Sequence, residues 1–160
     1  MPNFQVTAKT KIEIGDAIAD QNTDFTTSDF SGVTWTEIGG TTDLGTFGDT
    51  AEVVKSGQIG RGRVLKLKGL VDGGAWVITC DLDVADAGQL ALIAAAKTDD
   101  NYPFRLTFDD APSGGTASTR TVVGLVIGIP ETYGDANSPM KLVATVEVNS
   151  NTVRVAAAEA

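Results

Sequence analysis

The sequence predicts a mainly β domain: a β-sandwich or half-barrel of about seven to eight strands, with one flanking α-helix and a long inter-strand loop. Three observations lead to this fold class. Glycine (18 residues) and threonine (20 residues) are abundant, several segments alternate apolar and polar residues with period two, and only one segment has a helical period. A chain of 160 residues has the size of one domain, so residues 1–160 are expected to form a single unit.

The clearest strand is expected at 102–109, where Tyr102, Phe104 and Leu106 point to one side and polar residues to the other. The run 121–129 is apolar on both faces, which is typical of a strand covered on both sides. Alternation that is bounded by turn residues predicts the other strands. These are expected at 33–38, 63–70, 76–82 and 142–148, with weaker candidates at 11–17 and 153–155.

One helix is expected at 83–97. Asp83 is a good N-cap residue, and Asp86 falls in the first turn, where a negative charge is favourable. The spacing i, i+3, i+4 and i+7 gives one apolar stripe that would dock on a sheet. The residues of this stripe are Ala87, Leu90, Ala91 and Ala94.

A connection of more than twenty residues is expected at 39–62, and loops of this length are uncommon inside a compact domain. Its apolar residues argue against a solvated linker, because they need a surface to pack on. Either the loop folds back over its own domain or it reaches another chain. The apolar residues in question are Leu44, Phe47, Val53, Val54 and Ile59.

Charge is unevenly distributed along the chain, whose net charge is −9. Residues 1–54 carry −7, residues 55–71 carry +5 without any acid, and residues 72–160 carry −7. A basic segment in an acidic molecule suits a head-to-tail contact with an identical copy, although a solvated strand face would have the same composition. The acidic remainder disfavours binding to a phosphate backbone. The basic residues are Lys55, Arg61, Arg63, Lys66 and Lys68.

No catalytic, cofactor-binding or metal-binding residue is predicted. The chain has no histidine, which removes the commonest general base and zinc ligand. Cys80 lies in an apolar strand pattern and is expected to be a buried small hydrophobe. The acids around Asp83 lack the EF-hand spacing, and the glycines near Gly60 lack the lysine of a phosphate-binding loop. Acidic pairs at turns, such as Asp109 with Asp110, are expected to be solvated.

Four segments, taken in their order, resemble the tail tube (major tail) protein of long-tailed bacteriophages. The resemblance covers about residues 30–150. The specific part is the order W-x-x-I-G, then a loop, then G-R-x-x-K-L-K-G, then D-A-G-Q-x-A-L. The four segments are WTEIGG at 35–40, GTFGDTAEVV at 45–54, IGRGRVLKLKGLVDGG at 59–74 and DVADAGQLALIAA at 83–95.

The resemblance implies a non-enzymatic structural virion protein whose copies form sixfold rings stacked into a hollow tube, the conduit for DNA ejection into the host. It implies an N-terminal arm and first strand (1–30), an assembly loop (39–62), the helix (83–97) and a C-terminal tail (150–160), the last five residues of which are expected to fray. Other tail proteins would bind the tube ends: the tape measure, terminator and distal tail proteins. DNA would pass transiently without adhering, and no membrane is involved. Synthesis in the host cytoplasm is expected.

Ten residues are expected at subunit contacts, namely Leu44, Phe47, Val53, Val54, Lys55, Ile59, Arg61, Arg63, Lys66 and Lys68. Asp109 and Glu147, on polar strand faces, are expected to line the lumen, although the same pattern fits an outer solvated face. Two alternatives stay open. One is a type VI secretion-like tube protein. The other is a β-sandwich carbohydrate-binding or adhesin module, for which Trp35 and Trp76 would be exposed platforms.

Overall fold

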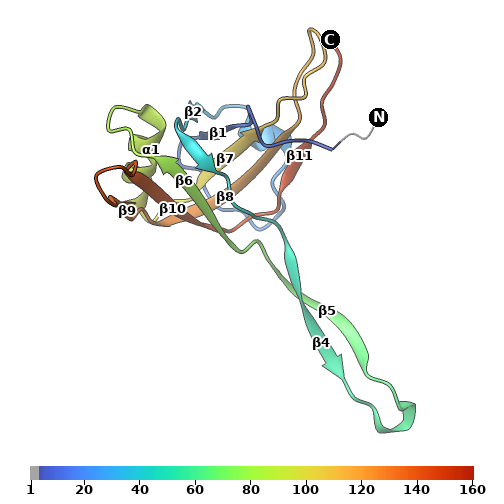
Figure 1. Cartoon of the computed structure of the whole chain (residues 1–160). Helices are drawn as coiled ribbons and strands as arrows, with labels where there is room; N and C mark the ends of the chain where they lie inside the picture. The colour runs from blue at the N-terminus through green and yellow to red at the C-terminus, as the bar shows by residue number, and fades with distance from the viewer. Residues whose placement is uncertain (1–3) are drawn as a thin grey trace.

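The computed structural model describes residues 4–160, so the first three residues of the expected N-terminal arm (1–30) lie outside the described part. It consists of a curled antiparallel sheet, one helix and a long β-hairpin that projects away from the sheet (Figure 1). The strands are β1 (Lys11–Ile14), β2 (Thr36–Glu37), β3 (Thr41–Asp43), β4 (Thr50–Ser56), β5 (Leu65–Asp72), β6 (Ala75–Asp81), β7 (Tyr102–Thr107), β8 (Thr119–Gly128), β9 (Glu131–Thr132), β10 (Lys141–Val148) and β11 (Val153–Val155). The helices are α1 (Ala87–Ala96) and the 3₁₀ turns η1 (Thr27–Phe30) and η2 (Ile59–Arg61).

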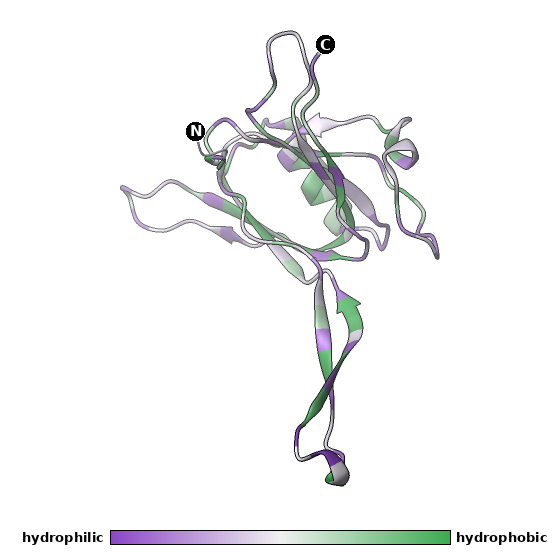
Figure 2. Ribbon diagram, turned by 90° about the vertical axis from the view of Figure 1, so that its right-hand side faces the viewer, coloured by the Kyte–Doolittle hydropathy of each residue, from purple (hydrophilic) through white to green (hydrophobic). Residues whose placement is uncertain are grey.

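The large sheet curls until its two ends meet. Its strand order is β2-β1-β7-β8-β10-β6-β3, with β11 beside β8 and β9 beside β10. The end strands β2 and β3 are separated in the chain only by residues 38–40, and Figure 2 shows the resulting rolled shape. The mainly β class with a half-barrel and one flanking helix is therefore confirmed, with nine strands in this sheet and two in the hairpin.

The core lies inside the curl, and the strand register explains it. Strands β6 and β10 are hydrogen-bonded neighbours in the sheet. Their inward-pointing residues lie directly opposite each other, and all of these residues are buried. Alternation along a strand places every second side chain on the same face, so the faces expected from the sequence are confirmed. The opposed pairs are Leu142 with Cys80, Ala144 with Ile78, and Val146 with Trp76.

Strand β8 is covered on both faces, as its apolar sequence predicted. Val122 packs in the main core, whereas Val123 belongs to a second apolar cluster on the other side of the sheet. Phe25 and Phe30, from the segment around η1, stack on each other in this second cluster with their ring centroids 5.7 Å apart. The N-terminal segment thus forms a cover for the outside of the sheet.

The expected helix has the wrong start and the wrong buried face. It begins at Ala87, and its N-cap is Asp86 and not Asp83. Leu90 and Ala94 of the expected docking stripe are exposed. The buried face is formed by Gly88, Gln89, Leu92 and Ala95.

Polar contacts at the start of α1 set this rotation. One Asp86 carboxylate oxygen accepts hydrogen bonds from the backbone N–H of Gln89 and of Gly39, at 2.9 and 3.1 Å. The buried Gln89 amide donates to the carbonyls of Gly39 and Asp81, and its oxygen accepts from the N–H of Asp83. A Cβ added at Gly88 would collide with the backbone carbonyl of residue 37. The helix end therefore holds the β2–β3 connection closely against the end of β6.

The prediction that residues 39–62 form a loop is wrong. It contains β3, β4 and η2, and β4 pairs with β5 to form the projecting hairpin. The sequence pattern predicted a strand at 63–70 but no partner for it. Val53 and Val54 stand next to each other in β4, so this segment lacks the regular alternation of apolar and polar residues that would have indicated a strand.

The end of the chain is paired, so the expectation of a frayed tail is wrong. Ala158 and Thr116 exchange both backbone hydrogen bonds, at 2.8 and 3.1 Å, and the tail runs beside the β7–β8 connection (Figure 1). Within that connection Asp110 accepts from the side chain and the backbone of Ser118. These hydrogen bonds hold the pKa of Asp110 below its usual value. Asp110 is thus a bonded turn residue.

None of the helices within residues 4–160 has the length and apolar character needed to span a membrane.

Replacing Gln89 by alanine should destabilise the domain by about 3 kcal/mol. The change leaves three backbone groups in a buried site without their partners, and each unmet buried group costs about 1–3 kcal/mol, with partial relief by relaxation. Urea unfolding followed by tryptophan fluorescence measures the change in the free energy of unfolding. Gln58→Ala, at an exposed glutamine, is the matched control and should change stability by less than about 0.5 kcal/mol. Equal effects of the two variants would contradict a role for Gln89 in holding the β2–β3 connection against β6.

Candidate assembly interface

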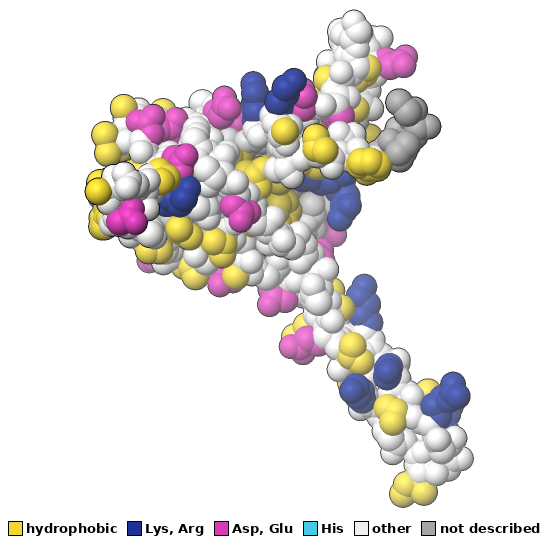
Figure 3. Space-filling model, in the orientation of Figure 1, with side chains coloured by type: hydrophobic (Ala, Val, Ile, Leu, Met, Phe, Trp, Pro, Cys, Tyr) yellow, Lys and Arg dark blue, Asp and Glu magenta, His cyan; other side chains and the backbone are white. Residues whose placement is uncertain are grey.

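The hairpin formed by β4 and β5 is exposed along almost its whole length, and we call residues 50–72 the arm. It extends far from the curled sheet (Figure 1) and carries apolar and basic side chains along its length (Figures 2 and 3). The arm makes a separate two-stranded sheet. Two-stranded hairpins without a packed face are marginal in water, so a surface that covered the arm would stabilise it.

The register gives the arm two different faces. Lys55 lies opposite Lys66, and Val53 opposite Lys68, so three lysines share one face. Like charges directly opposite each other on neighbouring strands repel. We call this the basic face of the arm.

The other face of the arm is apolar. Val54 lies opposite Leu67, and Ser56 lies opposite Leu65. Val54 and Leu67 are both exposed. A hydrophobic face of this kind on an otherwise polar molecule marks an interaction surface.

The tip of the arm combines one apolar residue with two arginines. Ile59 in η2 is 103% exposed, so no part of its own chain covers it. Arg61 ends η2, and Gly62 follows in the left-handed conformation at φ 65°, which turns the chain toward Arg63 and β5. Glycine adopts this conformation without strain.

The arm and the rest of the molecule have net charges of opposite sign. The arm holds five basic and two acidic residues, a net charge of +3, and the rest of the chain holds seven basic and 19 acidic residues, a net charge of −12. The three ion pairs among residues 4–160 are Lys9–Asp109, Arg105–Glu13 and Lys141–Asp81. None of them includes an arm residue.

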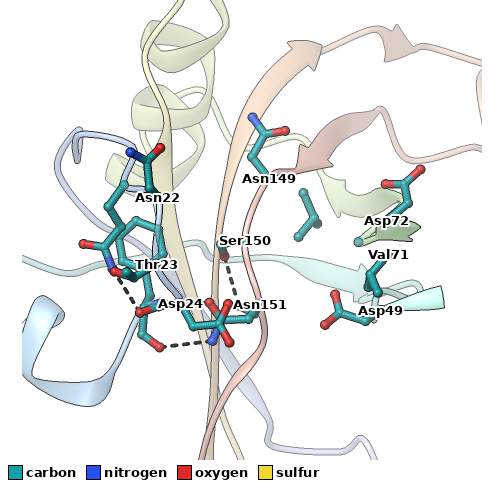
Figure 4. A pocket seen from close by; sticks show the side chains of 13 residues that line it. Asn22, Thr23, Asp24, Asp49, Val71, Asp72, Asn149, Ser150 and Asn151 are labelled. Carbon is teal, nitrogen blue, oxygen red and sulfur yellow. Dashed lines mark hydrogen bonds between the residues drawn. The ribbon is translucent and has the colours of Figure 1, made fainter. Parts of the chain in front are cut away.

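A polar cleft of about 390 Å³ lies at the root of the arm (Figure 4). Asp49 and Asp72 line it from the arm side, and Asp24 from the N-terminal segment. Asn151 fixes its other wall by bonding both the N–H and the carbonyl of Phe25, at 2.8 and 3.0 Å. Acidic and amide groups therefore surround the place where the arm leaves the sheet.

Three solved structures resemble this chain over most of its length. A chain of the anti-feeding prophage (AFP) baseplate has a TM-score of 0.67 at 15% identity, with 98% of both chains covered. A chain from the sheath/tube terminator structure of an extracellular contractile injection system, PVC, has 0.65 at 10% identity, with 98% of this chain and 96% of that chain covered. The SPP1 tail tube has 0.59 at 13% identity, with 91% and 77% covered.

The chain has the tail tube fold. No protein-family model matches the sequence, and no curated protein matches it. The likeness therefore comes from the three-dimensional arrangement of the strands, the helix and the arm, and not from overall sequence identity.

In this tail tube fold, the ten residues expected at subunit contacts fall into two groups. Leu44 and Phe47 are half-buried against the core, with the Phe47 ring centroid 4.6 Å from that of Trp76 and the Leu44 carbonyl accepting from the Trp76 indole. Their packing within their own chain anchors the root of the arm. The other eight lie on the arm or at its tip: Val53, Val54, Lys55, Ile59, Arg61, Arg63, Lys66 and Lys68.

Part of the apolar face was not predicted from the sequence, namely Leu65 and Leu67. The alternation L-K-L-K at 65–68 predicted a strand there but did not indicate where its apolar side lies. An amphipathic strand predicts one apolar face without saying which surface covers it. The register with β4 shows that the core does not.

The two residues expected in the lumen lie on different parts of the molecule. Glu147 is in the middle of the curled sheet on β10, between Ala75 of β6 and Leu125 of β8, with its side chain on the outer face. Asp109 follows β7 and pairs with Lys9 at 3.8 Å. The structure places Glu147 on a broad sheet face and Asp109 at the start of the β7–β8 connection.

The tryptophans are not exposed platforms, so the feature that would favour a carbohydrate-binding module is missing. Trp76 is fully buried. Trp35 is half-buried, and the Arg105 guanidinium lies over its ring at 4.4 Å from the centroid.

Cys80 is a buried core residue, as expected. Burial raises the pKa of its thiol to about 11, with smaller contributions from the carboxylates of Asp86 and Asp81. A thiol in this state is a poor nucleophile at neutral pH. Among residues 4–160 no group of acids and the cysteine is arranged to hold a metal ion.

The raised pKa of Cys80 predicts a loss of stability at high pH. The unfolded chain releases the thiol proton near pH 9, whereas the folded chain keeps it until about pH 11. The contribution is complete below pH 9 and declines by about 2 kcal/mol as the pH rises toward 11. Urea unfolding at pH 8, 9, 10 and 11 measures it. Cys80→Ala should be less stable throughout but show a flatter pH dependence, and parallel curves for the two proteins would contradict the assignment.

Proposed function

We propose that this chain is the structural subunit of a phage tail tube, in which six copies close a ring and rings stack into a hollow tube that conducts DNA into the host. The observation that carries the proposal is the arm, with its apolar face, its unpaired basic residues and its length, in a chain of the tail tube fold. A surface that is complementary to a different surface of an identical copy gives a heterologous contact. Such contacts close into rings when the rotation fits and otherwise grow into filaments.

The eight arm residues supply the subunit contacts in this proposal, while Leu44 and Phe47 fix the direction in which the arm leaves the sheet. Burial of the arm removes exposed apolar area from water, and each Å² of that area contributes about 25 cal/mol to the stability of the contact. Its basic residues meet the acidic surface of the neighbouring copies. Other tail proteins, of the tape measure, terminator and distal tail classes, would cap the two ends of the tube.

The charge distribution suits a conduit for DNA. With the basic groups of the arm covered by neighbouring subunits, the surface left for the channel is acidic, and an acidic wall repels a phosphate backbone. Glu147, on the outer face of the curled sheet, is the better candidate for the lumen because it lies on a broad sheet face. Asp109 is the second candidate. DNA then passes without being held.

Wild-type protein should sediment or elute as rings of about 100 kDa, six copies of 16.6 kDa, or as tubes visible by negative-stain microscopy. A variant in which Asn-Gly replaces residues 50–72 should stay a monomer of about 14 kDa, since the arm carries the contacts and a two-residue turn can close the hairpin. Circular dichroism should show that its sheet still folds. A wild-type protein that is monomeric under all conditions would overturn the proposal.

Reversing two charges at the tip, Arg61→Glu with Arg63→Glu, should block tube growth. Both residues are exposed and make no ion pair within residues 4–160, so the monomer should keep its melting temperature within about 2 °C. Light scattering during assembly measures growth. Lys97→Glu, at an exposed residue outside the arm, is the matched control and should assemble normally. Unchanged polymerisation of the double variant would count against an arm contact.

A further inference from the structure

An apolar groove of about 700 Å³ lies on the outer side of the curled sheet, between η1 and β11. It is continuous with the second apolar cluster, to which Phe25 and Val123 also belong. Thr121 and Arg105 form its floor on β8 and β7. The apolar groups that line it are Phe30, Val33, Trp35, Val153 and Val155.

The charges beside the groove that lack a basic partner are negative. Arg105 is paired with Glu13 at 2.8 Å, so the two neutralise each other. Asp29, in η1, is exposed, and a backbone hydrogen bond from Thr26 holds its pKa below the usual value, so it is ionised at neutral pH. Asp16 lies next to the groove through its contact with the N–H of Thr34. Arg154 of β11 alternates with Val153 and Val155 and therefore points to the opposite face.

The tip of the arm has the complementary composition. Ile59 is an isolated, fully exposed apolar side chain, and Arg61 and Arg63 follow it closely. A protein seldom leaves a large aliphatic side chain this exposed at the end of a long projection unless another surface covers it. The arm points away from the sheet (Figure 1), so its tip does not cover the groove of its own chain.

We propose that the arm tip of one subunit inserts Ile59 into the groove of a second copy, with Arg61 and Arg63 reaching the carboxylates of Asp29 and Asp16 at its rim. This inference rests on the proposed tube function and adds the acceptor surface to it. A projecting apolar residue and a pocket elsewhere on the same molecule make a heterologous contact, which leaves one free tip and one free groove at the ends of every open oligomer. The contact therefore propagates from copy to copy.

Disulfide trapping tests the contact directly. Cys80 is buried and does not interfere. The double variant Ile59→Cys with Ser31→Cys, in which Ser31 lines the groove, should give a ladder of covalent oligomers when assembled protein is oxidised. A mixture of the two single variants should give dimers only. The control pair, Ile59→Cys with Leu90→Cys on the exposed side of α1, should give no ladder.

The outcomes separate this inference from the proposed function. Tubes that form without a cross-link between the cysteines introduced at positions 59 and 31, or a ladder from the control pair, would overturn the groove as the acceptor and leave the tube function intact. A protein that forms neither rings nor tubes would overturn both. Oxidation before and after assembly distinguishes a contact in the tube from random collision.

Ile59→Asp provides a second test that needs no cross-link. The side chain makes no contact in the monomer, so the fold should be unaffected, and the critical concentration for assembly should rise about tenfold or more, the factor expected for one buried isoleucine. Val84→Asp, at a residue of comparable exposure outside the arm, should leave the critical concentration unchanged. A critical concentration that is equal in Ile59→Asp and the wild type would contradict insertion of the tip.

Discussion

The two ends of the curled sheet are held together by three residues, 38–40, and by the start of the helix that binds them. The Asp86 carboxylate accepts a hydrogen bond from the N–H of Gly39, and the Gln89 amide donates one to the carbonyl of Gly39. Gly88 has no side chain and therefore lets the helix approach the backbone of residues 37–38 closely. Strands β2 and β3 are the two end strands of the sheet, and if this junction opened, the interior that Ile38 helps to fill would be exposed. The D-A-G-Q sequence at residues 86–89 therefore holds the two ends of the curled sheet close together.

The position of the arm follows from this closure. The chain leaves the junction through β3, passes Phe47 against Trp76, and returns into β6, which pairs with both β3 and β10. The root of the arm is therefore attached to the sheet through the pairing of β3 with β6, whose inner residues are buried, and through the packing of Phe47 on Trp76.

The inward faces of the strands could be predicted from the sequence because alternation is local. The Tyr102, Phe104 and Leu106 face was predicted correctly for this reason. The helix face could not be predicted in the same way, since the apolar stripe through Leu90 is a good match to the helical period but the buried contacts of Gln89 rotate it outward. The strand β4 of the arm could not be predicted from the sequence for a related reason. Val54 pairs with Leu67 across a hairpin of consecutive strands, but β4 has two adjacent valines and no regular alternation, so no strand was indicated there.

In the proposed tube, charge and hydrophobicity have separate roles in assembly. Each copy carries −9, so copies repel one another as they approach, whereas screening over a Debye length of about 8 Å in physiological salt confines the attraction of the +3 arm to close range. Electrostatics can therefore orient an arm toward an acidic surface, but exposed charge pairs contribute at most about 1 kcal/mol each. The apolar face and Ile59 must supply most of the affinity. In the proposed tube, the same negative charge that opposes association would also keep a phosphate backbone from adhering, so the property that hydrophobic contacts have to overcome during assembly is the one that suits conduction.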